Sequence, residues 1–309
     1  MAITAVGSVA LDTITTSAGI AEDVLGGSLT YFSFAASLFV PVHLVAVIGD
    51  DFPAQYVSWF QGRPIHWDGV ERKAGGKTFR WSGLYSDDFS TRTTTSLALN
   101  VFQEFQPQLP AASRRQPYLF LGNIDPDLQL HVLSQMEHPA FVVSDTMDYW
   151  LLHKRQLVLD LLPRVHTFLL NDEEARLLSG EPDVVTAARW IVARGADCVI
   201  VKCGAAGSVL ATADGLARMP AFRVAQVADP TGAGDSFAGG LLGYIASRRD
   251  HQPGTMRDAM LHGAAVASFC VGSVGVGGLL SLTRQDVEAR VRQLQSARET
   301  DTAPVTSAL

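Results

Sequence analysis

The sequence predicts an α/β protein with a mostly parallel sheet that helices cover on both faces. From about residue 117 onward, short apolar segments typical of buried strands alternate with segments of helical periodicity. Strands connected through helices form right-handed βαβ units, which place the strands parallel to one another. A chain of 309 residues with 47% hydrophobic and 18% charged residues is long enough to bury one large core.

The first third of the chain contains two apolar strands and an inserted segment of different character. Residues 3–6 predict a buried strand, and Gly26 and Gly27 precede the helical run SLTYFSFAASLF. The segment HLVAVIGDD predicts a second buried strand. Between about residues 70 and 100, threonines, aromatic residues and alternating polar residues predict exposed antiparallel strands. These strands would form a small sheet inserted into the α/β chain.

The rest of the chain follows a regular order of strands and helices. Its predicted strands are PYLFLGN, AFVVSD, VHTFLL, DCVIVKCG, GSVLAT and FRVAQVAD. Its predicted helices begin near Asp127 and Leu151, lie in DEEARLLSG and VVTAARWIVARG, and recur near 235–248, 255–272 and 283–297. The polar residues of about 297–309 predict a disordered tail.

Composition excludes several classes of partner and site. A net charge of -7 provides no basic surface for a nucleic acid. The three cysteines form no CxxC pair, which predicts buried, reduced thiols in a cytoplasmic protein and no structural zinc. The N-terminal segment MAITAVGSVALD lacks the basic start of a signal peptide, and no apolar run is long enough to span a membrane.

The segment ADPTGAGDSFAGG, residues 228–240, predicts an anion site with an acid beside it. Gly232, Ala233 and Gly234 leave backbone N–H groups uncovered at the start of a helix, where the dipole also favours negative charge. Asp235 would accept the proton of an attacking hydroxyl, and the amides would hold a transferring phosphoryl group. The alternative is a tight turn followed by an ordinary helix N-terminal acid.

This segment closely resembles the C-terminal signature of the ribokinase-like, PfkB family of carbohydrate and nucleoside kinases. The resemblance implies that Asp235 is the catalytic base and that the amides of residues 232–234 stabilise the γ-phosphoryl group. It also implies a ribokinase-like three-layer αβα sandwich with a mostly parallel sheet and a small β-sheet lid. We therefore expect a single kinase domain over residues 1–309, with lid segments at about 12–28 and 70–101.

Other segments resemble the part of the family that binds the nucleotide. NDEEARLL has the family's N-x-x-E arrangement, which implies a water-mediated role in holding Mg²⁺ and the phosphates of ATP; a simple helix cap is the alternative. VKCGAAGSVL resembles the strand, turn and strand that lie against the nucleotide, and LHGAAVASFCVG resembles the helix beside the adenine pocket. The residues expected to bind the nucleotide or its metal are Asn171, Glu174, Lys202, Gly204, Gly207 and Thr231.

The N-terminal segment GSVALD and the Gly26-Gly27 pair resemble the family's acceptor side. There a carboxylate at a strand end would accept hydrogen bonds from substrate hydroxyls, although an Asx turn is the alternative. Tyr31 stands where ribokinase-like sugar kinases usually have an asparagine, and Ala10 stands where ribose kinases have another. The two changes favour a bulkier or more apolar acceptor than ribose, such as a nucleoside or a cyclitol. The residues expected to bind the acceptor are Asp12, Gly26, Gly27, Tyr31 and Asn123.

The resemblance also implies a possible potassium site, formed by Asp229 and the glycine-rich segment GSVGVGG. The lid strands have an edge that a second subunit would cover, which predicts a homodimer through the lid. The sequence leaves two other functions open: a non-catalytic nucleotide or sugar sensor on the same fold, and a vitamin kinase, which the lid disfavours. A nicotinamide dehydrogenase is disfavoured because no G-x-G-x-x-G follows the first strand.

Overall fold

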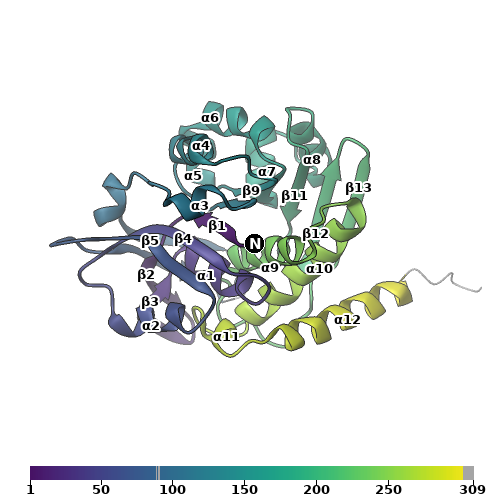
Figure 1. The fold of residues 1–309 in the computed structure, drawn as a ribbon. Coiled ribbons are helices and arrows are strands. Elements are labelled where there is room, and N and C mark those ends of the chain that lie inside the picture. Colours follow the sequence, from purple (N-terminus) through teal and green to yellow (C-terminus); the bar gives the residue numbers. More distant parts are fainter. Residues whose placement is uncertain (88, 90, 302–309) are drawn as a thin grey trace, which may run out of the picture.

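A computed structural model describes residues 1–87, 89 and 91–301, and it has two β-sheets surrounded by helices (Figure 1). In the described residues the larger sheet has nine strands in the order β13-β12-β11-β10-β9-β8-β1-β4-β5. From β11 to β5 neighbouring strands are parallel, whereas β12 and β13 pair antiparallel at one edge. In chain order these strands are β1 (Ile3–Val6), β4 (Val42–Gly49), β5 (Ile65–Lys73), β8 (Tyr118–Leu121), β9 (Phe141–Asp145), β10 (Thr167–Asn171), β11 (Cys198–Lys202), β12 (Ser208–Thr212) and β13 (Gly215–Met219).

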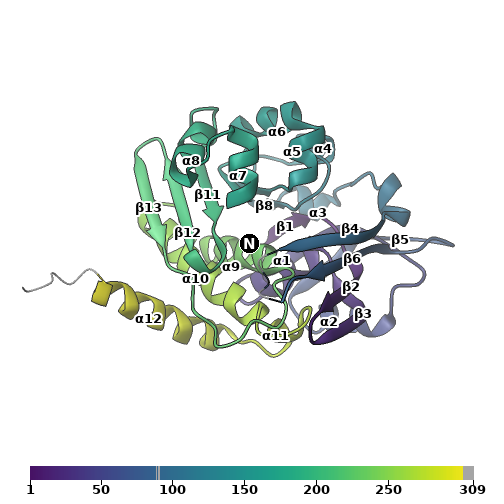
Figure 2. The same cartoon turned by 180° about the vertical axis from the view of Figure 1, so that it is seen from behind.

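Helices cover both faces of the larger sheet, which gives the three layers expected of a ribokinase-like fold (Figure 2). One face carries α1 (Ser28–Ala36), α2 (Ala54–Gln61), α9 (Ala233–Arg248), α10 (Pro253–Cys270), α11 (Gly277–Leu280) and α12 (Arg284–Asp301). The opposite face carries α4 (Pro126–Gln135), α5 (Asp148–His153), α6 (Arg155–Leu161), α7 (Asp172–Ser179) and α8 (Val184–Val192), with the short α3 (Ala111–Arg114) beside β1.

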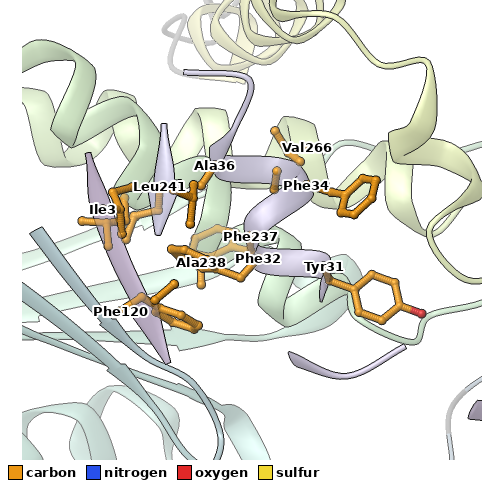
Figure 3. Packing of buried hydrophobic residues seen from close by; sticks show 14 of the residues in the cluster. Ile3, Tyr31, Phe32, Phe34, Ala36, Phe120, Phe237, Ala238, Leu241 and Val266 are labelled. Atoms are coloured by element: carbon orange, nitrogen blue, oxygen red, sulfur yellow. The ribbon is translucent and has the colours of Figure 1, made fainter. Parts of the chain in front are cut away.

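Side chains alternate between the two faces of each strand and so build two hydrophobic cores. In β11, Val199 and Val201 belong to the core under α4–α8, whereas Ile200 belongs to the core under α1, α9 and α10. The second of these cores is built on aromatic packing: Phe32 of α1 stacks on Phe120 of β8 with ring centroids 3.8 Å apart (Figure 3). This contact packs the middle of α1 against β8 of the larger sheet.

The smaller sheet has the order β3-β2-β6-β7 in the described residues and lies at one end of the larger sheet. Its strands are β2 (Ala10–Thr16), β3 (Gly19–Gly26), β6 (Phe79–Tyr85) and β7 (Arg92–Ala98). β2 pairs antiparallel with β3 and parallel with β6, and β6 pairs antiparallel with β7. Two segments that are far apart in sequence therefore form one sheet.

Two expectations about strands were wrong in detail. Residues 221–230 form no strand, because β13 already completes the sheet edge and the amides of Ala228 and Asp229 donate to the carbonyl oxygen of Val271 instead. Residues 70–73 belong to β5, which runs parallel to β4 in the larger sheet. The strands of residues 79–98, β6 and β7, do pair antiparallel as predicted, and β6 also pairs parallel with β2, a direction that alternation along a strand does not specify.

The C-terminal helix is longer than its sequence pattern indicates. α12 continues to Asp301, through the first residues of the predicted tail, and residues 302–309 of that tail lie outside the described residues. Among the helices that are described, none is both long and apolar enough to cross a membrane.

Candidate active site

Polar residues gather where the parallel strands of the larger sheet end. β9 ends at Asp145, β10 at Asn171 and β11 at Lys202, and Asn171 lies directly opposite Lys202 in the register. Along the sheet the chain proceeds from β1 to β4 and β5 in one direction and through β8 and β9 in the other. Ligands in open α/β sheets bind outside the carboxyl ends of the strands near such a reversal of strand order.

The signature segment forms the predicted turn and helix start at this edge. Gly232 precedes α9 with a φ of 73°, a left-handed conformation that favours glycine. A Cβ atom on Gly232 would lie 2.2 Å from Cγ of Tyr31, so the aromatic ring packs directly against the turn. The amide of Ala233 donates to the carbonyl oxygen of Pro230 at 3.2 Å, whereas the described residues offer no acceptor to the amides of Gly232 and Gly234. Two free N–H groups therefore accompany the positive end of the α9 dipole.

Asp235 lies in the first turn of α9, next to these amides, and is partly accessible to solvent. Burial raises the pKa of its carboxyl group to about 7, and the negative charge of Asp145 raises it further, whereas Lys202 and Arg92 lower it. A carboxyl group with a pKa near the operating pH is suited to accept and release a proton.

An ion pair between Asp145 and Lys202 stands beside Asp235. The Nζ atom of Lys202 donates to Oδ2 of Asp145 at 2.7 Å, and both side chains are largely buried, so Lys202 is not a solvent-exposed lysine at a strand end. Burial lowers the pKa of Lys202, but the nearby carboxylates, Asp145 first among them, together raise it above its ordinary value, which keeps the ammonium charged. The other oxygen of Asp145 accepts the amide of Thr146 at 2.9 Å.

The N-x-x-E pair forms a complete capping box at the start of α7. Oδ1 of Asn171 accepts the amide of Glu174 at 2.8 Å, and Oε2 of Glu174 accepts the amide of Asn171 at 2.7 Å. Asn171 is therefore a helix cap in this structure, as the simpler alternative predicted. The second carboxylate oxygen of Glu174 is left for another ligand.

The cluster of Glu174, Asp145 and Lys202 suits a cation that takes most of its ligands from water and from phosphate oxygens. Glu174 is buried, and burial raises its pKa to about 7, with Asp145 adding to the shift and Lys202 opposing it. In the described part of the chain, no three His, Cys, Asp or Glu side chains are arranged to hold a metal by themselves. Mg²⁺ commonly takes one or two carboxylates and completes its shell with water and phosphate oxygens, so the donor set fits that ion.

Two features lie in the segments that were predicted to bind the nucleotide. Gly204 and Gly207 both have positive φ, at 53° and 92°, in the turn between β11 and β12. A cavity of about 640 Å³ lies between residues 222–226 and the C-terminal end of α10, where Ser268 and Gly272 line it. Its size is that of a typical small-molecule site.

Asp12 of β2 is a buried carboxylate with one unpaired oxygen. Its side chain is 4% exposed, and its Oδ1 atom has no hydrogen-bond partner among the described residues. Burial raises its pKa to about 8, although the amide of Gly27 donates to it. A Cβ atom at Gly26 would lie 1.9 Å from Oδ2 of Asp12, which explains the glycine there. Gly27 has a φ of 91° and adjoins the carbonyl oxygen of Ser8.

Tyr31 does not offer an open aromatic face. Its ring is buried against Gly232, and its hydroxyl group lacks a partner in the described residues. Burial raises the pKa of this hydroxyl well above its ordinary value, and the charge of Asp12 adds to the shift. Figure 3 shows the Tyr31 hydroxyl pointing away from the packed Phe32 and Phe120 rings.

Asn123 and Asp229 make mainly structural contacts. Oδ1 of Asn123 accepts the indole N–H of Trp150 at 3.0 Å. The carboxylate of Asp229 is fully buried and accepts the amides of Thr231 and Gly275 at 2.8 and 2.9 Å. It thereby ties the signature to the glycine-rich segment near residue 275.

The smaller sheet reaches the signature through β6. The hydroxyl groups of Tyr85 and Thr231 lie 2.8 Å apart, so Thr231 contacts the small sheet. Arg92 of β7 pairs with Tyr85 across the strands, and its charge acts on Asp235. Sequence reasoning missed Tyr85, Arg92 and Asp145; only Asp145 had a usable signal, an acid directly after a buried parallel strand.

Comparison with known proteins identifies the family. Residues 12–282 match the model of the pfkB family carbohydrate kinases. The chain belongs to the pfkB family. It is a kinase that transfers a phosphoryl group to an alcohol, and kinases of this family use ATP.

Curated and solved relatives agree with this assignment. The kinase is 29% identical over 252 residues to cytidine kinase of Thermococcus kodakarensis, an alignment of 79% of this chain and 88% of the relative. The structure of a nucleoside kinase from Methanocaldococcus jannaschii superposes on this chain with a TM-score of 0.76 at 21% identity. The match covers 94% of this chain and 98% of the nucleoside kinase. The Burkholderia thailandensis nucleoside kinase in complex with inosine has a TM-score of 0.78 at 18% identity, covering 94% and 97%. At these identities the solved structures establish the fold.

The raised pKa of Asp12 predicts that this residue destabilises the empty kinase at neutral and alkaline pH. The folded-state pKa of about 8 exceeds the ordinary value of 3.8 for an aspartate, so the unfolded chain ionises first and the free energy of unfolding falls as the pH rises between these values. Asp12→Asn should remove this decrease in the free energy of unfolding, which is on the order of a few kcal/mol. Thermal melts should show a gain in Tm over the wild type that widens from about pH 5 to about pH 8. A gain that does not vary with pH would contradict the assignment.

Proposed function

We propose that this kinase transfers the γ-phosphoryl group of ATP to a primary hydroxyl of a nucleoside or sugar, with Asp235 as the general base. The observation that supports this most strongly is the position of Asp235. Its carboxyl group, with a pKa of about 7, stands beside the free amides of Gly232 and Gly234 at the start of α9. A base next to an anion-binding turn is what in-line phosphoryl transfer requires.

The transfer proceeds in one displacement. As the acceptor hydroxyl oxygen attacks the γ-phosphorus, its proton passes to the carboxylate of Asp235, and the bond from that phosphorus to the β,γ-bridging oxygen breaks to release ADP. The amides of Gly232 and Gly234 donate to the equatorial oxygens of the phosphoryl group in transit, while Ala233 keeps its bond to Pro230. The positive charge of Lys202, which also acts on Asp235, would attract the phosphates of ATP.

Glu174 and Asp145 are the residues that would hold Mg²⁺, through water and together with the phosphates. When bound, this ion would neutralise the negative charge that develops on the phosphates during transfer. The cavity beside α10 is proposed to take the adenine base, with the turn from Gly204 to Gly207 along the nucleotide.

Asp12 is proposed to orient the acceptor. Its Oδ1 atom is buried and has no partner among the residues that the structure describes, and a buried carboxylate oxygen that lacks a donor gains by accepting a substrate hydroxyl. A cytidine kinase aligns with this chain over 88% of its own length, which supports a nucleoside before other acceptors.

Potassium dependence and a homodimer remain predictions. Both oxygens of Asp229 already accept amides, so a monovalent cation would need other oxygens of the neighbouring loops; assays in potassium and in sodium salts should differ if it binds there. β7 is a free edge of the small sheet and is exposed along most of its length. A dimer by light scattering is expected, and a monomer would remove this prediction.

The test of the proposed function is ADP release from Mg-ATP across a panel of nucleosides, pentoses, hexoses and inositols. We expect turnover with at least one acceptor, with phosphorylated product in equal amount to the ADP. If no acceptor is phosphorylated, while a nucleotide or sugar still raises the melting temperature, the chain is a sensor on a kinase fold.

A further inference from the structure

Trp81 is a large aromatic residue that neither hydrophobic core uses. The chain has five tryptophans. Trp81 lies in β6 of the small sheet, is partly exposed and belongs to neither core in the described part of the chain. The other four pack against a core: Trp59, Trp67, Trp150 and Trp190. Since folding does not require the indole here, its contact area is available to a ligand.

The indole of Trp81 lies along the strand, over Gly83. A Cβ atom on Gly83 would be 2.0 Å from Cη2 of Trp81, so the ring fills the space that any other residue at position 83 would need. The indole N–H donates to the hydroxyl of Thr94 at 3.1 Å, which satisfies its polar group and fixes the orientation of the ring. The guanidinium carbon of Arg92 lies 5.7 Å from the ring centroid.

The register of the small sheet places Trp81 next to Asp12. β2 and β6 are parallel, and Asp12 lies directly opposite Trp81. Opposed residues on neighbouring strands are about 5 Å apart and point to the same face. Tyr85, four residues further along β6, shares that face and contacts Thr231 of the signature. The indole is therefore on the face that carries the proposed hydroxyl-binding carboxylate.

We propose that Trp81 is a specificity-determining residue whose indole stacks on the planar base of a nucleoside acceptor while Asp12 accepts the hydroxyls of its sugar. This inference rests on the proposed function and narrows its acceptor class. A nucleoside carries a flat aromatic base and vicinal hydroxyls on the same sugar ring, which matches an indole and a carboxylate on adjacent strands. A plain pentose or a cyclitol has no aromatic face for the indole.

The test compares Trp81→Leu and Trp81→Phe with the wild type, using cytidine, uridine, inosine and ribose as acceptors. Stacking of one base on an aromatic side chain corresponds to about 10- to 100-fold in affinity. We expect Trp81→Leu to raise the KM of each accepted nucleoside by about that factor with little change in kcat and no change in kcat/KM for ribose, and Trp81→Phe to retain most of the affinity. Leu84→Ala, an exposed change at the other face of the same strand, is the matched control and should leave all constants unchanged.

A second measurement does not depend on turnover. Titration with cytidine should quench tryptophan fluorescence in the wild type, and the quench should be lost in Trp81→Phe, which retains the other tryptophans. Unchanged nucleoside KM in Trp81→Leu, an equal loss for ribose, or a quench that persists in Trp81→Phe would overturn the inference. A loss that accompanies a change of molar mass in light scattering would also overturn it, in favour of a subunit contact. Failure of the proposed function would differ, because the wild type would then release no ADP with any acceptor.

Discussion

Asp235→Asn is expected to lower kcat by about 10²- to 10⁴-fold, the usual contribution of a general base. The amide has nearly the same shape as the carboxylate but does not accept the acceptor's proton, so binding of ATP and acceptor should change little. Steady-state ADP release and equilibrium binding measured on the same preparation separate the two effects.

The matched control is Asp286→Asn, which removes the same charge from the first turn of another helix, α12. Its kcat should equal that of the wild type. If Asp235→Asn keeps kcat within about threefold, Asp235 is only a favourable acid at a helix N-terminus.

Gly232→Ala is expected to impair both stability and catalysis. A left-handed backbone costs a residue with a side chain about 1–2 kcal/mol, and the new Cβ atom would lie 2.2 Å from the buried ring of Tyr31. The turn must therefore move, and a displacement of about 1 Å in a catalytic group can cost about 10²-fold in rate. A lower Tm in thermal melts and a loss of this size in kcat/KM are the expected results.

Gly254→Ala provides the comparison for Gly232→Ala. A Cβ atom at Gly254, in the first turn of α10, would meet no atom within 4 Å, and φ there is not positive. This variant should match or exceed the wild type in Tm because alanine favours helix. Equal Tm and activity for both glycine variants would show that the left-handed turn at residue 232 is not required.

The sequence predicted those parts of the site that are formed by residues close together along the chain. The turn at Gly232 and the start of α9 follow from glycine conformation and helix capping, and the capping box of Asn171 and Glu174 is encoded within four residues. The strand-end position of Lys202 was also predictable from its apolar run. Its ion pair with Asp145 was not, because that contact joins strands 57 residues apart.

The contacts of the small sheet could not be predicted from short stretches of sequence. The approach of Tyr85 to Thr231 spans 146 residues and depends on the parallel pairing of β2 with β6, which alternation within a strand does not specify. The predicted strand over FRVAQVAD failed for a related reason. Its apolar residues resemble a strand, but its backbone bonds are made to the loop after α10.

The pH dependence of kcat/KM, compared between the wild type and Arg92→Gln, tests most directly whether Asp235 is the base. Asp12 and Glu174 also have raised pKa values, at about 8 and about 7, but the charge of Arg92 is among the main influences on the pKa of Asp235. We predict that kcat/KM falls about tenfold per pH unit below the pKa of Asp235, about 7. Because the charge of Arg92 lowers that pKa, Arg92→Gln should move the fall to higher pH. A wild-type profile without an acid limb, or a limb that Arg92→Gln leaves in place, would contradict the assignment of Asp235 as the base.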